Sequence, residues 1–377
     1  MMKLMYVEDS LAILGGVERV LVDKLNWLVE YGDYEVCLLT ANQVDHPLVF
    51  SLHPKVMFHD LRIRFHQKYQ YSVWKRFHKE RKLHRLFQQR LSEKIHDFSP
   101  HVIICTRIEY VSDVIKVKGV VPFVFESHNC CRAYQFEKSS WLRKVQFFFH
   151  YQSIKKTQMV VSLTHNDAVE WRKLADHVVA IPNVVHLNAT GRYSDCQSRS
   201  VIFVGRYSYQ KDIRTLLKIW RLVHQLHPDW QLHLYGDYGN QQDDLLPEIK
   251  RMSINIVVHQ PTSAIFEEYL KNSMLLMTSY YEPFGLVLPE AMSCGLPVVA
   301  FDCPYGPADI ITDGVDGFLI KNRSINDFVE KVCMLMDDVS LRLKMGSEGI
   351  KSSQRYEASR VMPQWNNLFR ELAQDCL

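Results

Sequence analysis

Short runs of β-branched and other apolar residues alternate with longer helical stretches along nearly the whole chain. The runs that we interpret as strands are residues 4–8, 34–40, 101–106, 122–126, 160–164, 178–181, 201–205, 231–236, 254–259, 274–279, 297–302 and 317–320. Strands this apolar, separated by helices, are typical of parallel sheets covered on both faces. The polar, aperiodic segment 182–200 is a predicted linker. Because 377 residues exceed one compact core, we expect two doubly wound α/β domains, with ligands bound at the carboxyl ends of their strands.

The composition excludes several classes of protein. With 47% hydrophobic and 23% charged residues, the chain is neither disordered nor fibrous. No apolar run approaches the roughly 18–20 residues that span a bilayer, and Glu8 and Asp9 precede any signal-peptide core. The nine cysteines are odd in number and lack CxxC spacing, which argues against a disulfide framework or a zinc site. We therefore expect a protein that stays in the cytosol.

Charge is distributed unevenly along the chain. Residues 1–183 carry a balance of +7 and residues 184–377 a balance of −4, and most of the excess lies in residues 62–90. That stretch holds ten Lys or Arg and one acid, with aromatic residues between them, and residues 141–156 repeat the pattern. A basic helix with aromatic residues is typical of a segment resting on an anionic membrane surface. The alternatives are a solvated helix face and, with least support, nucleic acid, because no recognition motif accompanies the charge. No nucleic-acid partner is expected.

Two loops carry residues suited to binding an anion. Gly15 and Gly16 follow the first predicted strand and precede a helix, whose free amides can face a ligand. A tight turn explains this pair equally well, and the absence of GxGxxG argues against a dinucleotide enzyme. In the second half, Arg206 follows a strand and Lys211 precedes a helix. The fork of an arginine and the point charge of a lysine can together bind a diphosphate.

The segment SYYEPFGLVLPEAMSCG places two acids, Glu282 and Glu290, eight residues apart. Pro283 and Pro289 make one continuous helix through both acids unfavourable, so Glu282 is expected in a loop before a short helix. The amides expected to face phosphate oxygens belong to Phe284, Gly285 and Leu286. A carboxylate accepts hydrogen bonds from two vicinal hydroxyls, which suits a sugar or a ribose.

These motifs resemble those of a known enzyme family. EPFGLVLPE is similar to the E-x7-E motif of the retaining family 4 glycosyltransferases, and GGVERV, VGRYSYQKD and IPNV resemble the family's glycine loop, phosphate clamp and interdomain segment. EAMSCGLPVVAFDCPYGPADIITDGVDGFLI resembles members that build bacterial capsule, O-antigen and related surface glycans. The resemblance implies the GT-B fold, with two Rossmann-like domains facing across a cleft. It also implies an acceptor domain at 1–183, a donor domain at 184–357, and a helix at 358–377 that crosses back to the first domain.

The resemblance also implies roles for single residues. Glu290 would hold the nucleotide ribose, and Glu282 the hydroxyls of the donor sugar. Arg206 and Lys211 would neutralise the departing diphosphate, and His128 in FESHNC would lie near the donor sugar. For His128 a purely structural role is the alternative. Backbone amides would also contact the donor phosphates, at Gly15, Gly16, Phe284, Gly285 and Leu286. The nucleotide base would lie beside the segments that contain Gly236 and Gln260. No metal and no cofactor are expected, because the chain has no DxD triplet and its cationic side chains can stabilise the leaving group.

The implied activity is transfer, with retention, of a hexosyl unit from a nucleotide diphosphate sugar to a hydroxyl of a glycan or lipid-linked saccharide. A UDP-sugar is favoured, although Val184 and the turn His259-Gln260-Pro261 depart from the family pattern and leave the base open. The alternatives are a GDP-mannose-dependent mannosyltransferase, a nucleotide-sugar 2-epimerase of the same fold, and a non-catalytic nucleotide-sugar-binding protein. The expected location is cytoplasmic, peripheral on the inner face of the cytoplasmic membrane.

Overall fold

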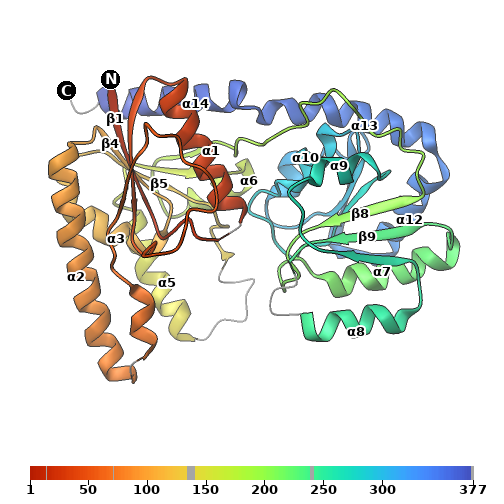
Figure 1. The fold of residues 1–377 in the computed structure, drawn as a ribbon, viewed down its shortest axis with the longest axis horizontal. Coiled ribbons are helices and arrows are strands. Elements are labelled where there is room, and N and C mark those ends of the chain that lie inside the picture. Colours follow the sequence, from red (N-terminus) through yellow and green to blue (C-terminus); the bar gives the residue numbers. More distant parts are fainter. Residues whose placement is uncertain (14, 71, 134–140, 238–241, 375–377) are drawn as a thin grey trace. The chain divides into compact units, whose positions relative to one another are not determined.

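The computed structural model describes residues 1–13, 15–70, 72–133, 141–237 and 242–374. The chain divides into two compact units (Figure 1). The first consists of Met1–Val184 and Val361–Leu377, and the second of Val185–Arg360.

The first unit is built on a parallel sheet whose described strands follow the order β3-β2-β1-β4-β5-β6-β7. These strands are β1 (Met2–Glu8), β2 (Tyr34–Thr40), β3 (Met57–Asp60), β4 (Val102–Cys105), β5 (Phe123–Glu126), β6 (Met159–Ser162) and β7 (Val178–Ala180). Every residue of β4 and β5 is buried. Helices on both faces of the sheet produce this burial, which explains why the strands appear in the sequence as continuous apolar runs.

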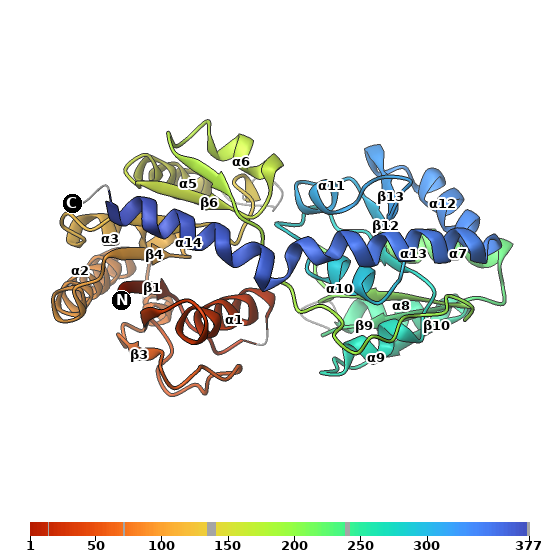
Figure 2. The same cartoon turned by 90° about the horizontal axis from the view of Figure 1, so that it is seen from above.

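Two sets of helices cover the two faces of this sheet. The elements are α1 (Gly16–Glu30), η1 (Phe65–Gln70), α2 (Val73–Phe98), α3 (Ile108–Val117), α5 (Trp141–Ile154), α6 (His165–Trp171) and α14 (Ala358–Gln374). Phe87 of α2 and Val111 of α3 share a buried cluster with Met5 and Val7 of β1. Tyr6, which alternates with them along the strand, instead faces α1 through Lys24. Figure 2 shows α1 and α14 on the same side of the sheet.

The last helix, α14, belongs to the first unit although it ends the chain. One face of α14 is buried, through Val361, Met362, Trp365, Leu368, Phe369 and Leu372. The ring of Phe369 meets Tyr34 of β2 edge-on at 5.8 Å between centroids. The Tyr34 hydroxyl donates a hydrogen bond to Asn366 Oδ1 at 3.1 Å. These buried residues are therefore the face through which α14 packs against the first unit.

The second unit repeats the architecture, with described strands in the parallel order β10-β9-β8-β11-β12-β13. Its strands are β8 (Ser200–Val204), β9 (Gln231–Tyr235), β10 (Ile256–His259), β11 (Leu275–Met277), β12 (Val298–Phe301) and β13 (Gly317–Ile320). Its helices are α7 (Ile213–Leu226), α8 (Gln242–Met252), α9 (Ile265–Leu270), α10 (Val287–Ser293), α11 (Gly306–Ile310), η3 (Lys321–Arg323), α12 (Ile325–Asp337), α13 (Val339–Ser353) and η4 (Gln354–Tyr356). Trp220 of α7 and Phe328 of α12 are fully buried in one cluster with the strands.

The prediction of two α/β units with parallel sheets is confirmed, and every predicted strand is present. β2 and β13 have the predicted bounds, β1 begins two residues earlier, and the other predicted strands are shifted or shortened. Strand β3 was not predicted. Its residues Met57–Asp60 alternate between exposed and partly buried positions at the edge of the sheet, so they lack the apolar run that marks an interior strand. None of the described helices is both long and apolar enough to cross a membrane.

Candidate functional site

The carboxyl edge of the second sheet gathers most of the predicted site residues. Strands β9, β8 and β11 are neighbours in the sheet. Arg206 follows β8, Gly236 follows β9, and the loop after β11 carries Glu282. Parallel strands end at one edge, so residues from these three loops lie close together, where open α/β sheets bind ligands. Arg206 is exposed at this edge.

Lys211 and Glu282 form an ion pair. The Lys211 ammonium lies 2.6 Å from Glu282 Oε2, and the Ser279 hydroxyl donates to the same oxygen at 3.0 Å. The Gln210 amide reaches the other carboxylate oxygen at 3.4 Å. The Glu282 side chain is only 8% exposed. Lys211, which is predicted to bind the diphosphate, is therefore paired with Glu282, which is predicted to bind the sugar hydroxyls.

Glycines shape the backbone around this pair. A Cβ atom on Gly236 would lie 2.0 Å from the Gly205 carbonyl oxygen, so the ends of β8 and β9 approach too closely for any side chain there. The Lys211 side chain crosses directly over Gly205. Gly285 has a φ of +98°, a left-handed conformation that favours glycine. Gly236 and Gly285, both predicted donor contacts, thus also have structural reasons to be glycine.

The loop that carries Glu282 is fixed at its backbone. The Glu282 amide donates to the Pro304 carbonyl at 2.7 Å, and the Glu282 carbonyl accepts from the Gly306 amide at 2.8 Å. The buried Phe284 ring meets Tyr356 edge-on at 5.2 Å. Helix α10 (Val287–Ser293) begins directly after Leu286, so Glu282 lies in a loop before a short helix as predicted, and Gly295 follows the helix with a φ of +81°.

Glu290 lies in the first turn of α10 and is partly buried. The Tyr269 hydroxyl of α9 donates to Glu290 Oε2 at 3.2 Å. The structure thus places both predicted acids in the second unit. Glu282 is held by Lys211, and Glu290 by a tyrosine from a different helix.

A stack of rings stands at the ends of β9 and β10, in the segment assigned to the base. The Tyr235 and His259 rings are parallel, 4.1 Å apart with an interplanar angle of 3°. His259 Nε2 lies 2.9 Å from His233 Nδ1, and the Tyr235 hydroxyl donates to Glu268 at 2.6 Å. Burial lowers the pKa of both histidines. Gln260 follows in an exposed loop. The sequence reasoning missed His233 and Glu268.

In the first unit, the Glu18 carboxylate lies against the loop that carries Gly15 and Gly16. The Gly15 amide donates to the Ile13 carbonyl at 2.9 Å, which closes a turn before α1. The Glu18 carboxylate lies so close to Gly15 that a Cβ atom there would be 2.3 Å from Glu18 Oε2. Gly16 is the exposed first residue of α1. An anion at this helix start would therefore have to displace the Glu18 side chain.

His128 lies in a buried charged cluster beside the end of β5. Its Nε2 atom is 3.1 Å from Glu126 Oε1, and Glu126 forms an ion pair with Lys24 of α1. The Lys24 ammonium also lies 4.0 Å from the centre of the Trp365 ring of α14. Burial would raise the pKa of Glu126, but Lys24 and His128 outweigh it and lower this pKa.

Glu8, at the end of β1, is another buried carboxyl group of the first unit, and burial raises its pKa against the opposing effects of Arg107 and Thr106. The sequence reasoning missed Lys24, Glu126 and Glu8. Glu8 and Glu126 could have been identified from the sequence, because each is an acid at the end of an apolar strand.

The basic stretch 62–90 contains both inward and outward aromatic side chains. Phe65 and Phe87 are buried in the core, whereas Phe77 is 57% exposed. On α5, Phe148 and Phe149 are also exposed. The exposed basic residues of α2 include Lys75, Arg81, Lys82 and Arg85. Tyr71 lies outside the described residues. The alternative of a solvated helix face, whose aromatic side chains would all pack inward, therefore holds for part of the stretch only.

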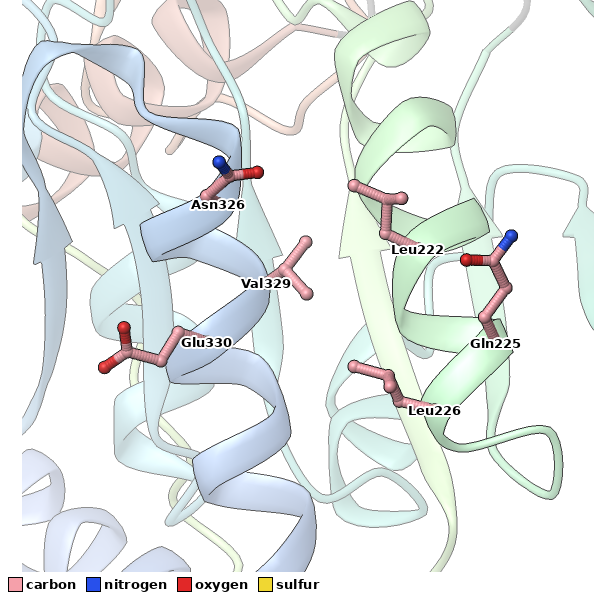
Figure 3. A pocket seen from close by; sticks show the side chains of 6 residues that line it. All are labelled: Leu222, Gln225, Leu226, Asn326, Val329 and Glu330. Carbon is pink, nitrogen blue, oxygen red and sulfur yellow. The ribbon is translucent and has the colours of Figure 1, made fainter.

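A shallow depression of about 360 Å³ on the second unit lies apart from these residues. It lies between α7 and α12, and Figure 3 shows its lining side chains: Leu222, Gln225, Leu226, Asn326, Val329 and Glu330. None of the predicted site residues lines it. Among the described residues, no group of three or more His, Cys, Asp or Glu is placed to hold a metal ion.

Comparison with known proteins places these observations in context. Residues 194–352 match the family described as glycosyl transferases group 1. The chain is 34% identical over 188 residues to the amylovoran biosynthesis glycosyltransferase AmsD of Erwinia amylovora, covering 48% of this chain and 52% of the relative. It is 23% identical over 345 residues to the lipopolysaccharide 1,6-galactosyltransferase of Escherichia coli, covering 87% of each. The alignment with AmsD thus spans about half the length of that relative.

Similarity to solved structures extends over the whole chain. The crystal structure of TarM superposes with a TM-score of 0.79 at 15% identity, covering 98% of this chain and 99% of that chain. A mutant of Staphylococcus aureus TarM has been solved with UDP and α-GlcNAc-glycerol. At this identity the likeness establishes the fold, which is GT-B as the sequence predicted. Residues 194–352, in the second unit, thus match glycosyl transferases group 1, and the chain has a GT-B fold.

Proposed function

We propose that this protein is a retaining glycosyltransferase of surface polysaccharide synthesis. It transfers a hexosyl unit from a UDP-sugar to a hydroxyl of a glycan or lipid-linked saccharide. The observation that carries the proposal is the Lys211–Glu282 ion pair, which lies with the exposed Arg206 at the carboxyl edge of a glycosyl transferases group 1 domain. The names of AmsD and of the E. coli galactosyltransferase support a surface polysaccharide as the product. The UDP in the TarM complex supports uridine diphosphate as the nucleotide of the donor.

In this proposal, electrostatic stabilisation of the leaving group accelerates the reaction. Negative charge develops on the diphosphate as the sugar departs, and Arg206 and Lys211 supply positive charge there. Their two charges take the part that a divalent cation plays in other transferases, so we propose a metal-independent reaction. When the diphosphate engages Lys211, the Glu282 carboxylate is released from its partner and accepts hydrogen bonds from the sugar hydroxyls.

The remaining predicted residues bind the rest of the donor. Glu290 accepts from the ribose hydroxyls, and the segment from Gly236 to Gln260 holds the base beside the Tyr235 ring. His128 is the first-unit residue that the resemblance assigns to the donor sugar. The acceptor binds on the first unit. Retention requires no enzyme nucleophile here, because the leaving phosphate assists deprotonation of the incoming hydroxyl.

The assignment is tested by Lys211→Ala and Glu290→Ala in a UDP-sugar turnover assay with the full chain. Removing a group that stabilises developing charge costs about 10²–10³-fold in kcat, so we expect losses of that order for Lys211→Ala. Glu290→Ala should raise KM for the donor. Lys218→Ala on the exposed face of α7 is the control and should keep the wild-type rate. Near-normal rates in both site variants contradict the assignment.

The nucleotide is tested separately by thermal shift with UDP, GDP, ADP and their sugars. A ligand that binds only the folded protein raises its stability by mass action. We expect the largest rise with UDP and UDP-sugars. A larger rise with GDP-mannose would instead support the mannosyltransferase.

We also propose that the first unit rests on the inner face of the cytoplasmic membrane. The exposed Phe77, Phe148 and Phe149 rings and the exposed basic residues of α2 support this partner. Vesicles with anionic lipid should sediment the protein, and salt should release it, because screening weakens surface charge interactions. Equal sedimentation with neutral vesicles contradicts the proposal, and a double variant, Phe148→Ser with Phe149→Ser, should weaken binding.

A further inference from the structure

We propose that Arg323 is a positioning residue that holds Lys211 against Glu282. This inference rests on the proposed function. Lys211 and Glu282 come from two loops, one between β8 and α7 and the other between β11 and α10. Their 2.6 Å contact joins residues 71 positions apart, so something must keep the two loops in register.

The Arg323 guanidinium bonds to both loops at once. Its Nη2 atom lies 2.6 Å from Asp212 Oδ2, next to Lys211 in the chain. Nη1 donates to the Ser279 carbonyl at 2.6 Å, and Nη2 donates to the Thr278 carbonyl at 3.0 Å. The planar fork of arginine presents several donors in fixed directions. One side chain therefore ties the neighbour of Lys211 to the residues that lead into Glu282.

Aromatic rings fix the plane of this fork. The guanidinium carbon lies 4.2 Å from the Tyr280 ring centre and 4.4 Å from the Phe301 ring centre. Tyr280 in turn stacks on Tyr209 of the β8–α7 loop, with 4.9 Å between centroids and an interplanar angle of 19°. A guanidinium packed on aromatic faces gains attraction from both rings and loses freedom to rotate.

Asp212 and Thr278 complete the connection on the side of Lys211. Asp212 caps the start of α7 by accepting the Thr215 amide at 3.3 Å, while its other carboxylate oxygen accepts from Arg323. The Thr278 hydroxyl donates to the Lys211 carbonyl at 3.0 Å and to the Asp212 carbonyl at 3.2 Å. The Lys211 backbone is thus held from two sides by groups that are themselves bound to Arg323.

The decisive variant is Arg323→Lys, which keeps a positive charge opposite Asp212 but removes the fork. A single ammonium on a flexible stem does not reproduce the three contacts in fixed geometry. We expect kcat for UDP-sugar turnover to fall about 10–100-fold, because a misplacement near 1 Å costs up to about 10² in rate. The Kd for UDP should rise by a smaller factor than kcat falls, because the proposed contacts to base and ribose lie elsewhere and only the diphosphate contact of Lys211 is disturbed. Asp212→Asn keeps a helix cap and should show a smaller loss of kcat.

Arg342→Lys is the matched control. Arg342 is a buried arginine of the same unit, on α13, that donates to the backbone carbonyls of Cys196, Leu335 and Met336 and packs 5.2 Å from the Trp230 ring centre. The variant should lower the thermal midpoint at least as much as Arg323→Lys. Its kcat should stay at the wild-type value, because Arg342 contacts neither loop.

The experiment measures kcat, KM, the Kd for UDP and the thermal midpoint of the full chain and its variants. A kcat loss in Arg323→Lys with retained UDP binding supports the inference. A wild-type kcat in Arg323→Lys, or an equal kcat loss in Arg342→Lys, overturns it. If the wild type itself neither binds nor turns over UDP-sugars, the proposed function fails. A crystal structure of Arg323→Lys then decides the inference alone, and an unchanged Lys211–Glu282 pair refutes it.

Discussion

Replacing Lys24 by methionine should strongly destabilise the first unit. The Lys24 and Glu126 side chains are each only 2% exposed, and they form an ion pair between α1 and the end of β5. Removing one partner of a buried pair leaves an uncompensated charge and costs about 3–5 kcal/mol. For a unit of this size, each kcal/mol lowers the midpoint by about 2–4 °C. We therefore expect the midpoint of Lys24→Met to fall by roughly 6–20 °C.

The assay is thermal and urea unfolding at pH 7, and an exposed ion pair provides the control. Lys173 is paired with Glu170, but its side chain is 53% exposed. Lys173→Met should therefore cost no more than about 1 kcal/mol. The double variant Lys24→Met with Glu126→Leu should recover most of the loss, because apolar replacement of a buried pair is often neutral.

The pH dependence gives an independent check. In the wild type, Lys24 and His128 lower the pKa of Glu126 in spite of burial. The Glu126 carboxylate therefore stabilises the folded protein above the ordinary pKa of a glutamate. This stabilisation is lost as the pH falls through the lowered pKa of the folded state. Without Lys24, burial raises this pKa, and the variant gains stability as pH falls. The difference between the two proteins should thus shrink in acid. A deficit equal to that of Lys173→Met, or one that does not shrink, refutes the reasoning.

Two further predictions concern the second unit. Gly236→Ala should destabilise this unit by about 1–3 kcal/mol or more, because the new Cβ atom would meet the Gly205 carbonyl oxygen. The control is Gly349→Ala in α13, where a Cβ atom has ordinary packing space. This variant should be neutral or stabilising in the same unfolding assay. The partly buried His233–His259 pair has lowered pKa values. Its contribution to stability is therefore present above the ordinary pKa of histidine and is lost as pH falls through the folded values. Midpoints measured from pH 7.5 to pH 5 should fall less steeply in His259→Gln than in the wild type, and parallel curves would contradict this.

Much of the candidate site could be predicted from local pattern. Glu282 lies in a loop and Glu290 in a short helix, as the two prolines of that segment predict, and Gly295 ends the helix in a left-handed conformation. The apolar stripe through Trp365 and Leu368 predicts the buried face of α14. These features depend on neighbours within a few residues, through backbone sterics and helical periodicity.

Contacts between distant residues could not be predicted in this way. Lys211 meets Glu282 across 71 positions, Lys24 meets Glu126 across 102, and Arg323 meets Asp212 across 111. Each contact depends on which strands are neighbours in a sheet. The order of strands cannot be predicted from the hydrophobic periodicity of the sequence. Edge strand β3 was missed for a related reason, because its partly exposed residues lack the apolar signal of an interior strand.

The sequence by itself determined the alternation of strands and helices, because strands buried on both faces must be apolar along their whole length. It also determined which loops carry acids, cations and glycines. Tertiary structure alone decided which of these charges neutralise one another. Sheet order brings loop ends together, and only side chains at contact distance with water excluded form pairs such as Lys24–Glu126 and Lys211–Glu282.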